Sequence, residues 1–415
     1  MVGATAGAER VEEMVIVGGG IAGIATALAL KRVGKGCLIL ERWHELRESG
    51  AAVGIQPNAW RALNALGIAN KLIPNYGILQ GGNVRNLETG TVQRVVFAGS
   101  SDREGYEARV VHRKALLEAL AEEIPPESIR FCSKLASIRT EVGPDSSNIT
   151  VLQLEDGDII KAKAVIGCDG LHSVVAQWLG LAPPRHSGRS AVRGLAVFPE
   201  GHGLNHEVQT FLTADKRGGF TPLNDHDVYW FIVHLTTPKV KEMGRHPELI
   251  QREVLLNLAV DLPPKLTEMV NHTVPSSLTW DPLMFRAPWQ VLFGRAHRGC
   301  VTVAGDAFHP TTPDLGQGAC VALEDAVVLA RCLARAESPK EVEESMERYV
   351  AERRWRVAGI ITASYFSGSV QQASAGVWTR VVRLVRDFLF YRFIFTWISG
   401  LARFDCGSLP RVEEK

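Results

Sequence analysis

The chain has 415 residues, of which 46% are hydrophobic and 22% are charged. That composition is typical of folded globular proteins, and the length allows about two to three domains. The formal net charge is only +1 at pH 7. This near balance argues against a nucleic-acid partner, because nucleic-acid binders usually carry a basic excess.

The seven cysteines are scattered along the chain, and no two of them form a C-x-x-C motif. An odd number without metal-ligand spacing favours free thiols in a reducing compartment and predicts no metal site. Met1–Glu13 contains three glutamates and no apolar core, so it does not resemble a signal or transit peptide. We therefore expect a cytoplasmic protein.

The chain opens with the pattern of a strand, a turn, a helix and a second strand. Met14–Val17 is a short apolar run, Ile21–Val33 is rich in Ala and Leu, and Cys37–Leu40 is apolar again. Such a unit predicts a parallel sheet, because its crossover helix covers one face of the sheet.

The turn in this unit reads Gly18-x-Gly20-x-x-Gly23. Three glycines at this spacing allow a tight turn, close approach of a pyrophosphate and close packing of the helix on the strand. The free N–H groups at the start of the helix also favour an anion. Glu41 ends the second strand, where a carboxylate binds an adenosine ribose and disfavours a 2′-phosphate. The pattern predicts FAD or NAD at this site, and the alternative is a glycine-rich turn without a ligand.

Two helices and a hairpin are expected in the next part of the chain. Asn58–Leu72 and Arg113–Ile124 are predicted to be helices, the second with an aliphatic face. Val151–Leu154 and Ile159–Ala162 flank an Asp-Gly pair, which predicts a hairpin. Ala164–Gly167 is predicted to be a further buried strand.

The middle of the chain, about 190 to 290, changes character. Short alternating runs such as Val208–Thr213 and Val228–Leu235 predict an antiparallel sheet. Helical periodicity returns briefly at Glu248–Val260. After this insertion we expect a buried strand at Cys300–Ala304 and helices at Gly316–Ala334 and Val342–Ala363. The order predicts two interleaved domains.

A second candidate cofactor motif follows the late strand. Gly305-Asp306 places a carboxylate at the carboxyl end of a strand, where ligands gather in such sheets and where a ribityl chain offers hydroxyls. Gly316–Gly318 then opens a helix, whose N–H groups can face a flavin pyrimidine and stabilise negative charge on the reduced ring.

Three ordered motifs resemble those of single-component (group A) FAD-dependent monooxygenases, the group of salicylate and para-hydroxybenzoate hydroxylases. They are the opening glycine turn, Cys168-Asp169-Gly170 after a strand, and Gly305-Asp306 with its Pro- and Gly-rich sequel. The stretch 47–59 and the tail 404–409 are similar to plant FAD-dependent monooxygenases related to zeaxanthin epoxidase and salicylate hydroxylase. The resemblance covers nearly the whole chain.

The resemblance implies an α/β fold like that of para-hydroxybenzoate hydroxylase. A Rossmann-type FAD-binding domain would be interleaved with a mostly antiparallel β-sheet substrate domain and followed by a C-terminal helical region. The expected FAD-binding domain is discontinuous and comprises residues 10–75, 108–188 and 290–365. The substrate domain comprises 76–107 and 189–289, and the C-terminal segment comprises 366–415.

The resemblance also implies a set of cofactor-binding residues. Arg42 would lie near the adenosine, Arg113 would reach toward the FAD phosphates, and Arg47 would sit near the flavin entrance. Asp169 would serve FAD and NAD(P)H together, and Asp306 would bind the ribityl or pyrophosphate region. The full set is Gly18, Gly20, Ile21, Ala22, Gly23, Glu41, Arg42, Arg47, Gly54, Arg113, Leu135, Asp169, Gly305, Asp306, Pro313, Gly316, Gln317 and Gly318.

Two of these residues have a simpler interpretation. Asp169 could cap a helix that begins near His172, since Asp is a favoured N-cap residue, and Arg113 could be a solvated helix residue. One position departs from the family pattern Asp-Gly-x-x-Ser-x-Val-Arg, because Ala176 stands where the Arg is common. That departure bears on NAD(P)H engagement and not on FAD.

The activity implied by the resemblance is hydroxylation of a small phenolic or benzoate-like aromatic substrate with NAD(P)H and O₂, through a flavin C4a-hydroperoxide. An epoxidase acting on an isoprenoid or carotenoid-like alkene, or a non-enzymatic relative, is the alternative. Because the flavin carries the chemistry, no catalytic acid or base is predicted. The mid-chain sheet is the expected wall of the substrate pocket. The candidate substrate residues, each of which could equally be core, are Phe211, Phe220, Pro222, Tyr229 and Trp230.

Other flavoprotein classes fit the sequence less well. A flavin-dependent halogenase would carry a Trp-x-Trp-x-Ile-Pro motif, which the chain lacks. A reductase with two nucleotide domains would need a second glycine fingerprint, and none is present. A scaffold resembling Rab-escort proteins would not need the flavin-facing Pro313 and Gly316–Gly318.

The C-terminal segment Arg380–Arg403 combines five arginines with a run of aromatic and aliphatic residues. A basic helix with an aromatic face can lie on a membrane surface, so peripheral membrane contact is one hypothesis. The other is a helix that packs across the domain. The uncharged stretch is too short to span a bilayer, which needs about 20 apolar residues.

We expect a monomer or homodimer whose partners are a small-molecule substrate and O₂.

Overall fold

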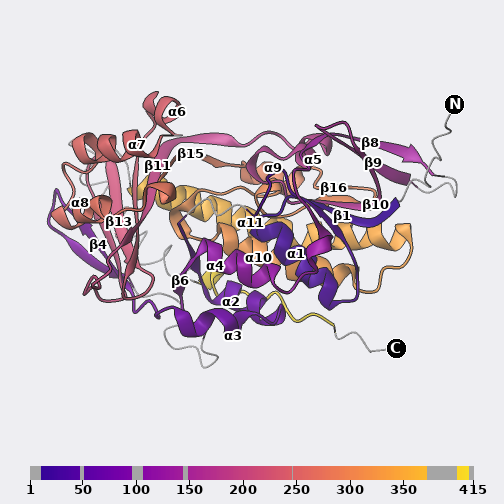
Figure 1. Ribbon diagram of the computed structural model, residues 1–415, viewed down its shortest axis with the longest axis horizontal. Coiled ribbons are helices and arrows are strands. Elements are labelled where there is room, and N and C mark those ends of the chain that lie inside the picture. The colour runs from indigo at the N-terminus through magenta and orange to yellow at the C-terminus, as the bar shows by residue number, and fades with distance from the viewer. Residues whose placement is uncertain are drawn as a thin grey trace, which may run out of the picture.

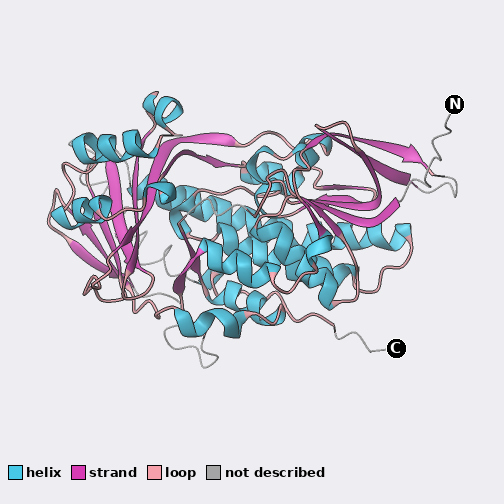
Figure 2. Ribbon diagram, viewed as in Figure 1, coloured by secondary structure: helices cyan, strands magenta, loops and turns pink. Residues whose placement is uncertain are grey.

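The computed structural model describes residues 11–46, 51–95, 106–143, 148–244, 246–371 and 400–410. Figure 1 shows a β-sheet toward each end of the long axis of the molecule, with a block of helices between the two sheets. The long helix α11 (Pro339–Gln371) runs lengthwise through this block. The same layering of strands at the ends and helices in the middle is visible in Figure 2.

The first sheet is of the nucleotide-binding type. From β17 to β7 its neighbouring strands are parallel, and Val15 pairs with Leu38 on one side and Val165 on the other. Val15 and Ile16 are fully buried, as expected for a parallel sheet covered on both faces. The helix α1 (Ile21–Arg32) follows β1 and packs against α10 (Gly318–Leu333). The strand order is β16 (His297–Arg298), β17 (Val301–Val303), β10 (Ile159–Gly167), β1 (Val11–Val17), β2 (Leu38–Leu40) and β7 (Ile129–Arg130).

The predicted hairpin around the Asp-Gly pair is present, but the strands at Ile159–Ala162 and Ala164–Gly167 are one strand, β10. Its first half pairs antiparallel with β9 (Asn148–Leu154), which pairs with β8 (Leu135–Val142), and it continues as a parallel neighbour of β1 and β17. The charged residue between the two predicted strands, Lys163, does not interrupt β10, because its exposed side chain reaches Glu13 at 2.6 Å.

Among the described residues, the second sheet has seven strands and is mostly antiparallel, as predicted for the middle of the chain. The single parallel pair joins β12 to β4. The strand order is β15 (Thr279–Phe285), β11 (Arg185–Val197), β14 (Asp227–Leu235), β13 (Lys216–Pro222), β12 (Val208–Leu212), β4 (Gly82–Asn86) and β5 (Val92–Val95). A short pair, β3 (Ala52–Ile55) with β6 (Arg109–His112), lies next to α10 through β3.

The two faces of the second sheet have different neighbours. In β14, Trp230 and Ile232 belong to a buried cluster with residues of α7 (Pro247–Glu253) and α8 (Pro264–Asn271). Tyr229 and Phe231 alternate with them and face the other side, where cavities lie between the sheet and the nucleotide-binding part. The period of two along a strand therefore separates a structural face from a cavity face.

Two predicted helices are divided in the structure. Asn58–Leu72 is split into α2 (Pro57–Ala65) and α3 (Ala69–Leu72), because Gly67 adopts a positive φ of 81° that ends the first helix. Glu248–Val260 is α7 followed by a π-helical turn at Val254–Leu258. The remaining helices are α4 (Arg113–Ala121), α5 (Val174–Trp178), α6 (Lys239–Met243) and α9 (Pro288–Phe293).

Within the described ranges, no helix is both long and apolar enough to span a bilayer. The C-terminal segment Arg380–Arg403, for which a membrane-surface helix and a packed helix were the two hypotheses, lies outside the described residues except for 400–403. Those last residues belong to a described tail, 400–410, which contacts α2 through a hydrogen bond from the Asn58 N–H to the Ala402 carbonyl.

Candidate functional site

A cavity of about 250 Å³ opens at the carboxyl ends of β1, β2 and β10. In a parallel α/β sheet this is the edge where ligands bind. Residues that the sequence predicted for a cofactor line it: Gly18, Gly20, Glu41, Arg42, Arg113, Leu135 and Asp169. Trp43, Ser133, Lys134 and His172 also line it, and no sequence motif had indicated them.

The three fingerprint glycines have distinct structural reasons. Gly18 has a φ of 106°, and a Cβ there would lie 2.4 Å from the Cys168 carbonyl oxygen. A Cβ on Gly23 would lie 1.9 Å from the Gly18 carbonyl oxygen. A Cβ on Gly20 would meet no protein atom within 4 Å, so at this position the backbone faces the cavity. This turn therefore leaves room for a pyrophosphate at the start of α1.

Glu41 is buried at the wall of this cavity and is held by the backbone around it. One carboxylate oxygen accepts the Gly19 N–H at 2.6 Å, and the other accepts the Trp43 N–H at 3.0 Å. An ionised carboxylate has about four acceptor positions, so Glu41 retains capacity for ribose hydroxyls.

Asp169 both caps a helix and lines the cavity. Its Oδ2 accepts the Val174 N–H at 2.7 Å and the Val175 N–H at 3.3 Å, so the simpler interpretation as a cap describes one of its oxygens. Its other oxygen, Oδ1, is buried without a hydrogen-bond partner. Burial raises the pKa of this carboxyl, while hydrogen bonds from Ser173 and the backbone lower it. A buried polar atom without a partner at the cavity wall fits a ligand that donates a hydrogen bond.

A second cavity of about 420 Å³ continues from the first, since Gly20, Arg113, Cys168 and Gly170 line both. Asp306 is exposed to it. Although the Asp306 side chain is open to this cavity, the protein atoms packed around it raise the pKa of its carboxyl. The charges of His309 and Arg113 lower that pKa. Further predicted cofactor residues on its walls are Ile21, Ala22, Gly54, Pro313, Gly316 and Gly318. Together the two cavities form one path that a dinucleotide with a ribityl chain and a planar ring would fit.

Among the described residues, three predicted cofactor residues do not line this path. Gly23 and Gly305 lie behind it, and a Cβ on Gly305 would be 2.7 Å from the Ala22 Cβ. Gln317 lines a third cavity instead. Arg47 lies outside the described residues. At the position where the family commonly has Arg, Ala176 is buried in the core.

The third cavity, of about 280 Å³, adjoins the second and shares Gly54, Val110, Pro313 and Gly316 with it. Its other walls come from the cavity face of the second sheet, from β6 and from the tail. They include Val84, Ala108, Val208, Phe231 and Leu401, with Arg109, Arg217 and Asp314 as the charged members. A largely apolar pocket with a few convergent polar groups is the usual form of a small-molecule site.

A buried ion triad lies where this cavity meets the loop after Pro313. Arg189 donates two hydrogen bonds to Asp314, at 2.9 and 2.8 Å, and Arg217 approaches the same carboxylate at 2.9 Å. The three side chains are at most 8% exposed. Burial alone would raise the pKa of Asp314, but Arg217 and Arg189 lower it below its usual value, so the carboxylate is ionised. The triad carries a net charge of +1.

Of the five predicted substrate residues, Tyr229 lines the second cavity. Phe211, Phe220 and Trp230 instead pack in the buried cluster on the opposite face of the sheet, and Pro222 lines none of the three cavities. Four of the five predicted substrate residues therefore line none of the three cavities. The strand register puts Tyr229 and Phe231 on the cavity face and Trp230 on the structural face, so strict alternation along β14 could have selected Tyr229 over Trp230.

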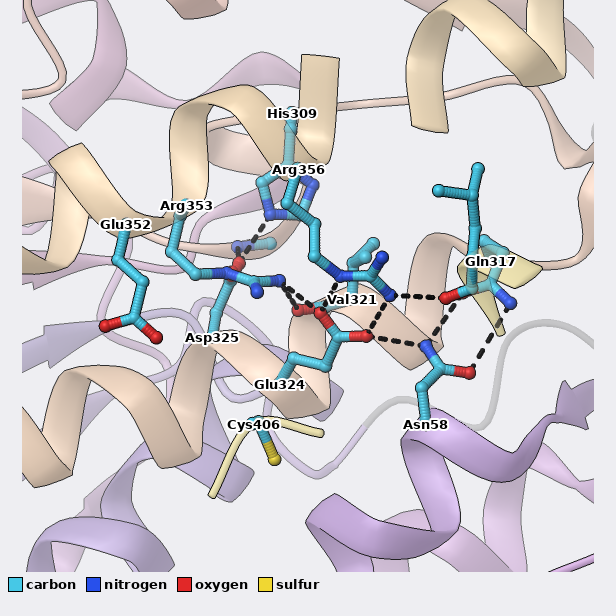
Figure 3. A network of polar contacts seen from close by, with 12 residues as sticks. Asn58, His309, Gln317, Val321, Glu324, Asp325, Glu352, Arg353, Arg356 and Cys406 are labelled. Carbon is cyan, nitrogen blue, oxygen red and sulfur yellow. Dashed lines mark hydrogen bonds and ion pairs between the residues drawn. The ribbon is translucent and has the colours of Figure 1, made fainter. Parts of the chain in front are cut away.

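Figure 3 shows a network of buried charges in which Glu324 and Asp325 of α10 contact arginines of α11. Glu324 accepts hydrogen bonds from Arg353 at 2.6 Å and from Asn58 at 2.6 Å. Asp325 accepts from Arg353 at 2.7 Å and pairs with His309 at 2.5 Å. Because every one of these side chains is buried, each charge depends on its partners.

We expect this network to make the fold sensitive to acid. Burial alone would raise the pKa of Asp325. His309, Arg353 and the Gly305 N–H outweigh that effect, and the pKa falls from 3.8 to about 2. A folded-state pKa below the unfolded one stabilises the protein above the unfolded pKa, and that stability is lost as the pH falls from about 4 to about 2. The difference corresponds to about 2 kcal/mol.

The check is the Asp325→Asn variant, measured by urea unfolding of the FAD-loaded protein between pH 7 and pH 2.5. It should be less stable than the wild type at pH 7, and its unfolding free energy should fall less steeply below pH 4. Asp156→Asn, in the exposed hairpin turn, is the control and should follow the wild-type curve. Parallel curves for Asp325→Asn and the wild type below pH 4 would contradict the assignment.

Comparison with known proteins adds a separate line of support. A family model described as FAD binding domain matches residues 12–364. Monooxygenase 2 of Arabidopsis thaliana is 39% identical over 96% of this chain and 98% of its own length. The 3-hydroxybenzoate 6-hydroxylase of Klebsiella oxytoca is 29% identical over 96% of this chain and 98% of its own length. Klebsiella pneumoniae HpxO, solved with FAD and uric acid, matches with a TM-score of 0.79 and 24% identity, covering 94% of this chain and 96% of that one, which shows a shared fold.

Proposed function

This chain belongs to the FAD binding domain family and is a group A FAD-dependent monooxygenase, and from that premise we propose that it uses NAD(P)H and O₂ to hydroxylate a small anionic aromatic substrate of the phenolic or benzoate type. The observation that carries the proposal is an excess of positive charge on the cavity face of the second sheet. Arg189, Arg193 and Arg217 lie there with one buried carboxylate, Asp314.

When bound, FAD supplies the redox chemistry and the activation of oxygen, and the protein supplies binding and orientation. The residues present fit the cofactor, because the unpartnered Asp169 oxygen and the open Gly20 backbone face the first cavity. Pro313 and Gly316 line both the second and third cavities. A planar ring bound in the second cavity would therefore adjoin a substrate that occupies the third cavity and extends to the sheet-side wall of the second.

Arg193 is the residue best placed to bind an anion. It lines the second cavity, and among the described residues no hydrogen bond or ion pair holds it. Tyr229 lines the same cavity, and burial raises the pKa of its phenol while Arg193 and Arg217 lower it. Its hydroxyl therefore stays protonated at neutral pH and can donate a hydrogen bond to a carboxylate or phenolate.

The charge also separates this proposal from the epoxidase alternative. A neutral alkene would leave Arg193 without a partner in a partly buried site, whereas an anion would pair with it. The 3-hydroxybenzoate 6-hydroxylase is named for an aromatic carboxylate, and the HpxO structure contains uric acid. Both names agree with a planar, polar ring as the substrate.

We predict that Arg193→Met weakens binding of a benzoate-type substrate about 10- to 100-fold, because a hydrogen bond to a charged group contributes about 1.5–3 kcal/mol. Arg185→Met changes the same residue type on the same strand, where Arg185 lies over the Trp289 ring, and should leave binding unchanged. The measurement is the Kd from perturbation of flavin absorbance, for a benzoate and its neutral amide. Equal losses for the acid and the amide would count against a charge-binding role for Arg193.

The substrate class itself is tested by a screen of phenols, benzoates and isoprenoid alkenes. NAD(P)H oxidation, hydrogen peroxide and product mass are recorded for each compound. The proposal expects stimulated NAD(P)H oxidation and a product heavier by one oxygen atom for an anionic aromatic compound. Peroxide as the sole product of every aromatic compound, or oxygenation confined to the alkenes, would refute the proposal.

A further inference from the structure

The tail of the chain forms part of the third cavity. Leu401 and Ala402 line it together with Leu315 and Gln317 of the flavin-facing loop. The tail is attached by its backbone to the start of α2, where the Asn58 N–H donates to the Ala402 carbonyl at 2.9 Å and Arg61 donates to the Arg403 carbonyl at 2.9 Å. The first N–H groups of a helix have no partner within the helix, so the tail carbonyl satisfies one of them.

Arg356 of α11 is the main side-chain contact of this tail. Its Nη2 donates to the Leu401 carbonyl at 2.9 Å, and its guanidinium carbon lies 4.1 Å from the centre of the Phe404 ring. The ring of Phe404 also lies 5.5 Å from the guanidinium carbon of Arg353. Cation–π contacts of a desolvated arginine are among the stronger ones, so Arg356 contacts the tail both through its backbone and through its aromatic side chain.

The same arginine is fixed by the buried network. Its Nε and Nη2 donate to the two oxygens of Glu324, at 2.8 and 2.6 Å, and Figure 3 shows the two side chains facing each other. The Arg356 side chain is 8% exposed and that of Glu324 is fully buried. A bidentate arginine–carboxylate pair has a defined geometry that lysine does not reproduce.

The network continues from Glu324 to the flavin-facing loop. Asn58 donates to Glu324 at 2.6 Å and to the Gln317 side chain at 2.9 Å. Gln317 donates to Gln56 at 2.7 Å, and Gln56 donates to the Leu315 carbonyl at 2.7 Å. One chain of polar contacts therefore joins the tail carbonyl of Leu401 to the loop that borders the flavin.

We propose that Leu401 and Ala402 determine the size of substrate that the third cavity accepts, and that Arg356 is a positioning residue which holds them there through Leu401, Phe404 and Glu324. The size-selection part rests on the proposed function, because it takes the third cavity as the substrate site. The positioning part does not, since it concerns only the attachment of the tail. Arg356 itself lines none of the three cavities, so it acts through the residues it holds.

The size-selection part is tested with FAD-loaded protein and a panel of benzoates with ring substituents of increasing size, using flavin absorbance for Kd. Leu401→Ala should lower the Kd of the larger compounds relative to the Kd of the smaller ones by about tenfold. That is the lower end of what one methylene contributes in an apolar pocket. Ala402→Leu should shift the ratio the other way. Leu409→Ala, in the same tail but away from the described cavities, is the control. Unchanged ratios for both cavity variants, or no binding of any compound, would overturn this part.

The positioning part is tested without a substrate, through the buried thiol of Cys406 in the same tail. Arg356→Leu should make Cys406 react with a thiol reagent at least about tenfold faster than in the wild type, relative to the exposed Cys132, with FAD content unchanged. The labelling rate of Cys406 in Arg356→Lys should lie between those of Arg356→Leu and the wild type. In Arg348→Leu, on the exposed side of α11, the rate should match the wild type. Labelling of Cys406 at the wild-type rate in Arg356→Leu would overturn the role. A failure of the oxygenation screen would not change the Cys406 labelling rates. The proposed function and the positioning role of Arg356 can therefore be refuted separately.

Discussion

Gly23→Ala is expected to reduce FAD affinity about 10- to 100-fold and to destabilise the fold, whereas Gly20→Ala should reduce only the affinity. A Cβ on Gly23 would lie 1.9 Å from the Gly18 carbonyl oxygen, and a backbone oxygen cannot yield as a flexible side chain does. The helix α1 must move away from the turn, at a cost of about 1–3 kcal/mol for overpacking. The same movement displaces the N–H groups that would meet the pyrophosphate.

The two other glycines make this prediction specific. A Cβ on Gly20 meets no protein atom within 4 Å, so Gly20→Ala should keep wild-type stability as apoprotein but obstruct the cofactor. Gly36→Ala, in an open loop, should change neither property. The measurements are FAD titration by fluorescence quenching and thermal unfolding of the apoprotein. Wild-type FAD affinity in both Gly23→Ala and Gly20→Ala would mean that the turn does not bind the cofactor.

Asp314→Ala is expected to lower the free energy of unfolding by about 3–5 kcal/mol and to abolish turnover. Removing this carboxylate leaves Arg189 and Arg217 buried without their shared counter-charge, and breaking one partner of a buried ion cluster costs about that much. The loop that carries Asp314 also carries Pro313 and Gly316 at the cofactor path. Loss of the triad should therefore disturb the wall between the second and third cavities.

The control for this variant is an exposed pair. Lys163 and Glu13 lie 2.6 Å apart with side chains 50% and 72% exposed, and an exposed pair contributes at most about 1 kcal/mol. Glu13→Ala should therefore leave both stability and turnover close to the wild type. Urea unfolding and NAD(P)H-dependent turnover at matched FAD content are the measurements. A destabilisation by Asp314→Ala no larger than that of Glu13→Ala would show that the triad is not a buried charge cluster.

Local patterns explain why the nucleotide-binding part could be predicted well from the sequence. The strand, the glycine turn, the helix and Glu41 lie within about 30 consecutive residues, and each has its own chemical signature. The family model and the relatives confirm FAD as the cofactor and monooxygenation as the activity class. The predicted and observed bounds of helices and strands differ where a single residue ends or continues an element. Gly67 ends a helix that periodicity alone had extended, and Lys163 points outward from a strand that its charge had seemed to divide.

The substrate side could not be predicted in the same way, because its parts come from distant segments. Arg189 and Asp314 are 125 residues apart, and nothing near either residue indicates the other. Aromatic content alone selected Phe211, Phe220 and Trp230, but the strand register buries these three in the opposite face of the sheet. The tail was similar to plant relatives by its Phe404–Leu409 sequence, yet only the fold brings Phe404 against Arg353 and Arg356.

Turnover under ¹⁸O₂ tests the central claim most directly, namely that this chain binds FAD and transfers one oxygen atom to an anionic aromatic substrate. The purified FAD-loaded protein is supplied with NAD(P)H, ¹⁸O₂ and the best-binding benzoate or phenol of the screen, and the product is read by mass spectrometry. We expect one ¹⁸O atom per product molecule and about one NAD(P)H consumed for each. NAD(P)H oxidation that yields only labelled hydrogen peroxide, or a product whose new oxygen comes from water, would contradict it.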